Sequence, residues 1–292
     1  MKLAEYFTGR RRPIISFEIF PPKTDKAMDQ LARVLPRLIE LSPDYMTVTY
    51  GAFGATQART IEIAGRIKAE FSMEVASHLT CVGLTCEKID AILDDLHDTG
   101  VENIVALRGD PPQGEEKFVA PEGGLAHANE LVEHIGGHRH SFSIAVAGYP
   151  EKHVEAADMD TDLRHLKRKV DAGADIVITQ LFYDNRDYFS FVERAREAGI
   201  TTPIVAGLLP IQSFGQIKRI TSLCGSKIPA SLNGALERAG DDVEKVKEVG
   251  IEWAVEQAHA LLEADVPGIH FYVLNRANHM ERIFGAIPEL TR

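Results

Sequence analysis

Residues 166–179, LKRKVDAGADIVIT, contain a short unit that recurs along the chain. A basic helical segment ends at Ala172-Gly173, and the β-branched apolar run 175–179 follows directly. Glycine just after the last helical residue is a common helix stop. A short run rich in Val and Ile is typical of a buried strand. The stretch therefore predicts a helix, a tight connection and one strand of a parallel sheet.

The same order of helix, glycine and strand recurs from one end of the chain to the other. Gly100 and Gly199, for example, each precede a short apolar run. The pattern predicts about eight strands, at residues 14–20, 45–50, 74–79, 103–107, 142–147, 175–179, 203–207 and 269–273. Eight βα units are the number that closes a barrel. We therefore expect an α/β fold in which residues 1–292 form a single (β/α)8 TIM barrel domain.

One connection is longer than a single helix requires. Between the seventh and eighth predicted strands, residues 229–240 and 241–263 are expected to form extra helices. The alternative fold is an open doubly wound sheet, which hydrophobic periodicity alone does not exclude. Such sheets usually carry G-x-G-x-x-G or a P-loop, and neither motif occurs in this sequence. The barrel is therefore the favoured interpretation.

Composition excludes several classes of function. A formal charge of −11 over 292 residues argues against a nucleic-acid partner, which requires a positive face. The basic residues near the N-terminus precede too short an apolar stretch for a signal peptide, and no segment has membrane-spanning length without charges. The three cysteines lack zinc-type spacing, so we expect reduced thiols and no metal. These features predict a cytoplasmic protein with small-molecule partners, and they leave homo-oligomer formation open.

Polar residues collect where the predicted strands end, which is where barrel enzymes carry their chemistry. Glu18 is the most informative of them, because it lies between Phe17 and Ile19 in an apolar strand. A carboxylate there loses hydration, so its pKa should rise and the protonated group could donate a proton near neutral pH. The alternative is an ion pair with Arg12 or Lys23. The stiff turn at Pro21-Pro22 favours the functional interpretation.

Three further features are weaker signals. Asp110 follows Gly109 and precedes two prolines, which suits either a ligand-binding loop or a simple turn. His78 near a strand end suits either a ligand contact or a structural hydrogen-bond donor. The basic run 166–169 could bind a pyrophosphate, although a solvated basic face is the commoner explanation.

Eight motifs together carry a resemblance to a known family. They are SFEIFPPK at 16–23, VTYGA at 48–52, HLTC at 78–81, ALRGD at 106–110, LKRKVDAG at 166–173, ITQ at 178–180, GLLP at 207–210 and FYVLNR at 271–276. In this order, over nearly the whole chain, they resemble the bacterial methylenetetrahydrofolate reductases. The resemblance implies FAD at the barrel mouth, reduction of that FAD by NADH or NADPH, and ping-pong reduction of 5,10-methylenetetrahydrofolate to 5-methyltetrahydrofolate. Of the two nucleotides, the bacterial type favours NADH.

The resemblance also implies roles for individual residues. Glu18 matches the general acid that protonates a folate nitrogen, and Asp110 lies near the flavin and the pterin. The other implied FAD contacts are Thr49, Tyr50, Ala52, His78, Leu107, Arg108, Gly109, Tyr149, His153, Asp162, His165, Arg168 and Lys169. The implied folate or nicotinamide contacts are Gln180, Phe214 and Arg276. His165 departs from the bacterial pattern, which has Asn there. The chain ends soon after the last predicted helix, so we expect no regulatory domain.

Two other functions remain open at this stage. One is a different barrel enzyme that binds a phosphorylated metabolite through Arg108 and Lys169. The other is a flavin or folate binder without catalytic activity.

Overall fold

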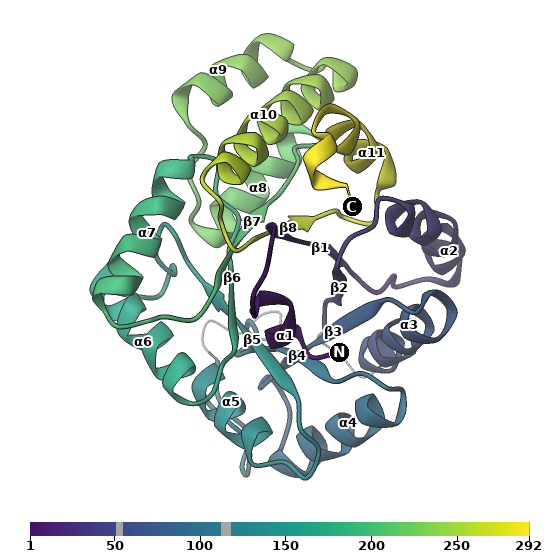
Figure 1. The fold of residues 1–292 in the computed structure, drawn as a ribbon, viewed down its shortest axis with the longest axis vertical. Coiled ribbons are helices and arrows are strands. Elements are labelled where there is room, and N and C mark those ends of the chain that lie inside the picture. The colour runs from purple at the N-terminus through teal and green to yellow at the C-terminus, as the bar shows by residue number, and fades with distance from the viewer. Residues whose placement is uncertain (51–54, 112–117, 292) are drawn as a thin grey trace.

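The computed structural model describes residues 1–50, 55–111 and 118–291, with backbone alone at residues 55 and 56. Its strands are β1 (Ile14–Ile19), β2 (Tyr45–Val48), β3 (Glu74–Thr80), β4 (Asn103–Leu107), β5 (Ser143–Gly148), β6 (Ile176–Thr179), β7 (Ile204–Leu208) and β8 (Gly268–Tyr272). Each strand pairs in parallel with the next, and β8 pairs with β1, so the sheet closes into a barrel (Figure 1). The predicted fold class is confirmed, and each predicted strand overlaps an observed one.

Helices cover the outside of the barrel (Figure 1). Those of the regular βα units are α2 (Asp25–Glu40), α3 (Ala55–Phe71), α4 (Cys86–Asp98), α5 (Ala128–Gly136), α6 (Met159–Asp171), α7 (Asn185–Glu197) and α11 (Ala277–Ala286), and a 3-10 turn, Pro288–Leu290, follows. Several begin at a polar cap, which is the usual residue type before the first turn of a helix. The Thr85 side chain, for example, accepts a hydrogen bond from the backbone of Lys88, and Asp158 accepts one from Thr161. Within the described ranges, no helix is long and apolar enough to cross a membrane.

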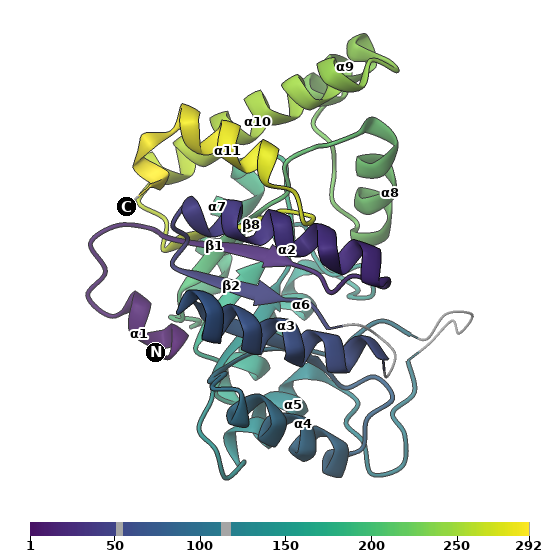
Figure 2. The same cartoon turned by 90° about the vertical axis from the view of Figure 1, so that its right-hand side faces the viewer.

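The long connection between β7 and β8 contains α8 (Phe214–Cys224), α9 (Ala230–Ala239) and α10 (Val243–Glu263). The last two occupy the segments predicted as extra helices. Leu232, Leu236 and Val246 of these helices pack against Leu181, which follows β6, and Leu209, which follows β7. Together they form a small hydrophobic cluster that is separate from the main core. In the side view, α8 lies at the end of the barrel towards which β1 and β2 point (Figure 2). Helix α8 therefore stands beside the barrel mouth.

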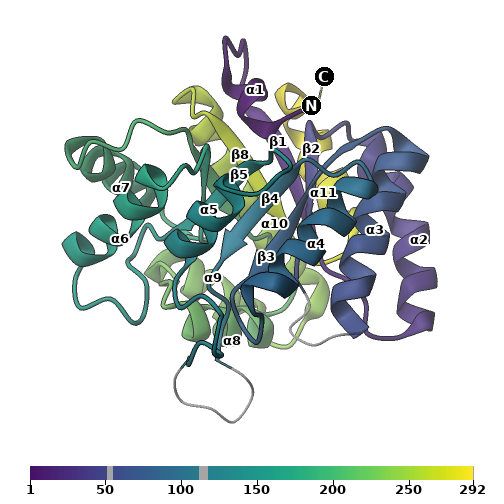
Figure 3. The same cartoon turned by 90° about the horizontal axis from the view of Figure 1, so that it is seen from below.

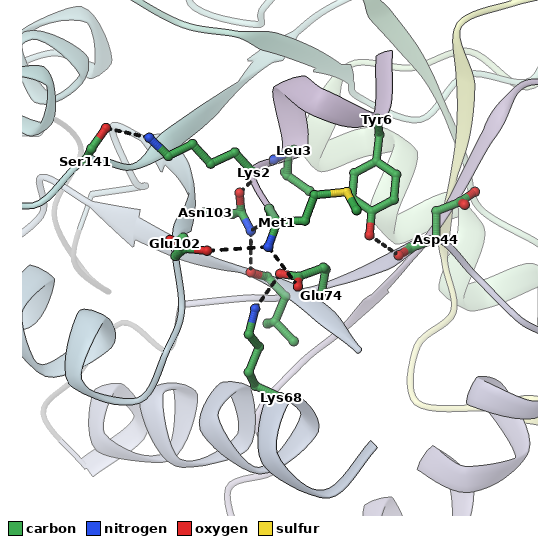
Figure 4. Close-up of polar contacts among 11 residues, drawn as sticks. Met1, Lys2, Leu3, Tyr6, Asp44, Lys68, Glu74, Glu102, Asn103 and Ser141 are labelled. Atoms are coloured by element: carbon green, nitrogen blue, oxygen red, sulfur yellow. Dashed lines mark hydrogen bonds and ion pairs between the residues drawn. The ribbon is translucent and has the colours of Figure 1, made fainter. Parts of the chain in front are cut away.

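The opposite end of the barrel is closed by α1 (Leu3–Phe7). Figures 2 and 3 show α1 and both chain ends at this end. Leu3 is fully buried among apolar residues from several strands, and its backbone N–H donates to Asn103 Oδ1 at 2.8 Å. Tyr6 donates its hydroxyl proton to the carbonyl oxygen of Asp44 at 3.0 Å (Figure 4). Helix α1 thus forms the floor of the barrel, and the carboxyl ends of the strands form the mouth through which ligands reach the interior.

The alternation of side chains along β1 decides which residues face the barrel interior. Phe17 faces outward and packs edge-on against Phe271 of β8 and Phe284 of α11. Its neighbours Ser16 and Glu18 face inward, and both pair in register with β8, Ser16 opposite His270 and Glu18 opposite Tyr272. The outward aromatic cluster thus fixes the rotation of the strand and directs the Glu18 carboxyl into the barrel.

Candidate active site

A cavity of about 650 Å³ opens at the carboxyl ends of the strands. Its polar lining comes from loops and strand ends that are distant in sequence. These residues include Glu18, Thr49, Tyr50, His78, Thr80, Asp110, Tyr149, Gln180 and Tyr272. Apolar side chains such as Leu107, Leu181 and Leu209 complete the walls. A mostly apolar cavity with a few convergent polar groups is the usual form of a small-molecule site.

Glu18 lies in this cavity with its side chain 18% exposed, and it has two histidine partners. His78 Nε2 of β3 is 3.2 Å from Glu18 Oε2, and His270 Nε2 of β8 is 3.5 Å from the same oxygen. Burial alone would raise the pKa of Glu18, but the charges and hydrogen bonds of the two histidines outweigh it and lower the pKa to about 2. The predicted direction of the shift is therefore wrong.

The alternative ion pair of Glu18 with Arg12 is also excluded. Arg12 makes a bidentate contact with Asp44 at the other end of the barrel, at 2.7 and 3.0 Å. The functional interpretation of Glu18 thus stands on its place in the cavity rather than on a raised pKa.

The loop after β4 brings Asp110 to the same cavity. Gly109 has φ of +87°, a conformation that favours glycine. A Cβ atom at this position would lie 2.7 Å from Val82 Cγ2, so the close approach of the two loops also requires glycine. The predicted loop role of Gly109 therefore has a geometric basis, and the turn it makes places the Asp110 carboxyl at the mouth.

A second cavity of about 230 Å³ adjoins the first, because Leu107, Ala147 and Tyr149 line both. Its walls are rich in cationic and imidazole groups, namely Arg108, His127, His153, His165, Arg168 and Lys169. Two carboxylates, Glu155 and Asp162, also line it. Several cationic groups around one cavity can bind an anionic ligand such as a diphosphate.

Lys169 is the most deeply buried of these cations. Its Nζ donates to the carbonyl oxygen of Ala147 at 2.5 Å and lies 5.8 Å from the centre of the Tyr149 ring. Burial lowers its pKa to about 8, although Asp162 opposes the shift. At neutral pH Lys169 is therefore mostly charged and faces the second cavity. Arg108, by contrast, is held by a bidentate contact with Glu155 at 2.6 and 2.8 Å.

Most of the predicted site residues meet in these two cavities. Ala52 lies outside the described residues. Phe214 begins α8 under the ammonium group of Lys218 and is not among the described lining residues of either cavity. Arg276 caps α11, is exposed, and likewise does not line them in the described part of the chain. Their predicted ligand contacts stay predictions.

Sequence reasoning missed the buried side chains beneath Glu18. The register pair Ser16 and His270 lies two residues closer to the floor of the barrel than the pair Glu18 and Tyr272. Thr47 Oγ1 is 3.5 Å from Glu18 Oε2. Tyr272 donates its hydroxyl proton to the carbonyl oxygen of Thr179 at 2.7 Å across the barrel. A signal did exist: His270 stands two residues before Tyr272, so strand alternation directs both inward.

Glu151, in the loop after β5, offers a test of stability. Its side chain is 5% exposed, and it accepts hydrogen bonds from the backbone N–H of Lys227 at 3.0 and 3.2 Å. Burial raises its pKa from 4.5 to about 7. Between these pH values the folded protein holds a proton that the unfolded chain has lost, so stability falls as pH rises.

We therefore expect Glu151→Gln, which mimics the protonated carboxyl, to raise the melting temperature at pH 8. The difference from the wild type should shrink as pH falls and should approach zero only well below pH 4.5, where the wild-type carboxyl is protonated in both states. Thermal unfolding followed by circular dichroism from about pH 3.5 to 8 measures this. A difference independent of pH would contradict the assignment.

The fold and the site define a class: (β/α)8 barrel proteins with a small-molecule cavity at the mouth and an adjoining cationic cavity. A sequence profile of the family described as "Methylenetetrahydrofolate reductase" matches residues 3–288. The chain is 42% identical over 278 residues to "Methylenetetrahydrofolate reductase (NADH) 1" of Arabidopsis thaliana, covering 92% of this chain and 47% of that protein. It is 39% identical over 263 residues to "5,10-methylenetetrahydrofolate reductase" of Escherichia coli K12, covering 90% and 86%. The chain belongs to the methylenetetrahydrofolate reductase family.

The chain spans about half the length of the plant relatives it matches. Among solved structures, it is similar to an uncharacterized Clostridium thermocellum protein that binds two copies of 5-methyl-5,6,7,8-tetrahydrofolic acid, with a TM-score of 0.64, 19% identity and 97% of each chain covered. A dihydropteroate synthase from Xanthomonas albilineans, in complex with 7,8-dihydropteroate, gives a TM-score of 0.52 at 13% identity, covering 94% of this chain and 92% of that one. At these identities the similarities show the barrel fold alone.

Proposed function

We propose that the protein reduces 5,10-methylenetetrahydrofolate to 5-methyltetrahydrofolate, with bound FAD and with NADH as the reductant. The observation that carries this proposal is the Glu18 carboxyl, directed into the mouth cavity and in contact with two histidines. Family membership and the names of the relatives support the reaction class, and the names of the plant relatives support NADH. The Clostridium neighbour, which binds 5-methyltetrahydrofolic acid on a similar barrel, is consistent with a folate ligand.

The residues present fit a flavin nucleotide. The larger cavity has apolar walls and room for a ring system, and the adjoining one carries the cations that a diphosphate requires. We assign Arg168 and Lys169 to the diphosphate and Asp162 to a ribose hydroxyl. Thr49, His78 and Tyr149 would hold the ring system. A bound FAD supplies hydride transfer at its N5 atom, from the nicotinamide to the folate in a ping-pong sequence.

The chain's own residues supply the proton and the electrostatics. Glu18 in its protonated form donates its proton to a folate nitrogen, which opens the five-membered ring and leaves a cationic iminium that accepts hydride. One proton and one hydride enter the folate for each product formed. Asp110 stabilises the positive charge of the iminium from the mouth loop. Gln180 lines the same cavity and is assigned to the pterin.

Anaerobic flavin spectroscopy on the purified wild-type protein tests the proposal. We expect a yellow protein whose flavin absorbance is bleached by NADH and restored by 5,10-methylenetetrahydrofolate, with 5-methyltetrahydrofolate as the product. Replacing NADH by NADPH compares the two donors under the same conditions. A colourless protein that binds no FAD would favour the phosphorylated-metabolite enzyme. A flavin that is bleached but never restored by the folate would favour a non-catalytic binder.

A further inference from the structure

One side-chain amide joins the ends of β1 and β8 at the mouth. The Asn275 Nδ2 atom donates to the carbonyl oxygen of Phe20 at 2.8 Å, and the Phe20 N–H donates to Asn275 Oδ1 at 3.0 Å. Glu18 and Tyr272 are the last register pair of the two strands. The two hydrogen bonds, here named the Asn275 bridge, therefore lie just beyond the strand pairing and extend it to the mouth.

The bridge depends on an unusual backbone. Leu274 and Asn275 have φ values of +50° and +54°, and the described part of the chain holds no other pair of consecutive non-glycine residues with positive φ. Asparagine adopts this left-handed conformation more readily than most residues, whereas leucine rarely does. Such a conformation persists only where surrounding contacts hold it, and it is frequent at functional sites. The turn after β8 is therefore a candidate functional element.

The bridge holds Phe20, which shares a face with Glu18. Because Phe20 lies two positions after Glu18, strand alternation directs both side chains towards the mouth cavity, and both line it. Phe20 is nevertheless 41% exposed. Pro21 restricts the backbone of Phe20 to extended conformations and has no N–H of its own. The Asn275 bridge thus satisfies the last free backbone groups of this strand end and fixes the position of the Phe20 ring.

Leu274 completes an apolar edge of the mouth beside Phe20. It lines the same cavity and packs against the hydrophobic cluster that contains Leu181 and Leu209. The left-handed turn directs Leu274 into the cavity while the next side chain, Asn275, reaches β1. Phe20 and Leu274 therefore present two apolar side chains to a ligand at the strand ends that carry Glu18 and Tyr272.

We propose that Asn275 is a positioning residue for the folate. Its bridge holds Phe20 and Leu274 as an apolar edge that packs on the bound folate and keeps the reacting nitrogen at Glu18. Proton transfer requires the two atoms to lie within hydrogen-bond reach, so a small displacement of the folate slows this step. The inference rests on the proposed function. Reduction of the flavin by NADH uses no proton from Glu18, so Asn275 acts mainly on the folate half-reaction.

Closure of the barrel does not require the bridge. The five register pairs from Ile14 with Gly268 to Glu18 with Tyr272 join β1 to β8, and the Val273 N–H donates to the carbonyl oxygen of Glu18 at 3.3 Å. Asn275 also does not cap α11, whose N-cap residue is Arg276. Removing the Asn275 amide therefore leaves the sheet closed and releases only Phe20 and the turn.

Asn275→Asp tests the bridge through pH. Aspartate keeps the size of the side chain, tolerates the left-handed backbone and still accepts from the Phe20 N–H. Only its protonated form can donate to the Phe20 carbonyl oxygen. In anaerobic stopped-flow reoxidation at pH 8, we expect the apparent dissociation constant of 5,10-methylenetetrahydrofolate to rise by about 10- to 50-fold over the wild type. This ratio should fall towards one as pH is lowered to 5.5, because the carbonyl oxygen favours the protonated carboxyl.

Asn275→Gly separates the charge from the loss of the bridge. Glycine adopts positive φ freely, so the turn is kept while both hydrogen bonds are removed. The apparent dissociation constant should rise by a similar factor at every pH, and bleaching by NADH should stay within about threefold of the wild-type rate. Asn278→Asp is the matched control, since Asn278 Oδ1 accepts from Arg37 and this contact requires no donated proton. It should match the wild type at both pH values.

A double-mutant cycle shows whether Asn275 acts through Phe20. Phe20→Ala removes an exposed ring and should by itself raise the apparent dissociation constant of the folate. In that background, Asn275→Gly should add no more than about twofold, because the ring that it positions is already absent. Phe20→Ala also decides the matter if the turn variants do not fold, since wild-type folate affinity in this variant would overturn the proposal.

The outcomes separate this inference from the proposed function. If the wild-type flavin is not reoxidised by the folate, the proposed function fails and the inference fails with it. If it is reoxidised, three results would each overturn only the role of Asn275. They are wild-type folate affinity in Asn275→Gly, a ratio for Asn275→Asp that does not change with pH, and an equal loss of the NADH and folate half-reactions.

Discussion

Glu18→Gln is expected to slow folate reduction by about 10²- to 10⁴-fold, the usual contribution of a positioned general acid. The amide has nearly the size of the carboxyl and retains a hydrogen-bonding oxygen, but it holds no transferable proton. Bleaching of the flavin by NADH should stay near the wild-type rate, since hydride transfer from the nicotinamide does not involve this proton. Anaerobic stopped-flow absorbance at the flavin band measures the two half-reactions separately.

Glu74→Gln is the matched control for this prediction. Glu74 begins β3 at the floor of the barrel and contacts Lys68 Nζ at 2.5 Å, so the same substitution there tests general damage to the barrel. We expect it to preserve both half-reactions. Folate reduction that survives Glu18→Gln intact would refute the assignment of Glu18 as the acid.

Lys169→Met is expected to weaken FAD binding by about 10- to 100-fold, because a hydrogen bond to a charged group contributes roughly 1.5–3 kcal/mol. Methionine keeps most of the buried stem and removes only the ammonium. The wild-type affinity should fall as pH rises through about 8, since Lys169 loses its proton there and with it the attraction for the diphosphate. Fluorescence titration of FAD from pH 6.5 to 9 measures both effects.

Another lysine of the same helix provides the control. Lys167 pairs with Asp171 on α6 and is absent from the described lining of the second cavity. Lys167→Met should leave FAD affinity and its pH dependence unchanged. A Lys169→Met protein that still loses affinity as pH rises past 8 would show that another group controls the binding.

Local sequence patterns predicted the barrel because each of its helix–strand units is formed by residues that are close together in the sequence. A helix, a glycine and a strand fit within a short stretch such as residues 166–179, and closure follows from repeating that unit. The position of Asp110 at the mouth follows from the same units, because it comes just after a strand. Lys169 lies in the last turn of α6, and only the family resemblance predicted its place beside the second cavity.

Phe214 and Arg276 illustrate what such patterns do not decide. Each lies at the start of a helix, α8 or α11, and the direction of its side chain depends on how that helix packs. Phe214 packs under Lys218 of its own helix, and Arg276 faces solvent. Helix orientation is set by contacts with distant segments, so sequence position alone did not place these side chains.

For Glu18, the sequence by itself determined its place, and the tertiary structure determined its protonation. Alternation along an apolar strand directs the carboxyl inward, and burial then suggests a raised pKa. The opposite direction arises from His78 on β3 and from His270, which is 252 residues away in the chain. Electrostatic interaction depends on distance in space. The pairing of β1 with β2 and of β2 with β3 brings the His78 ring to the carboxyl, and closure of the barrel between β8 and β1 brings the His270 ring.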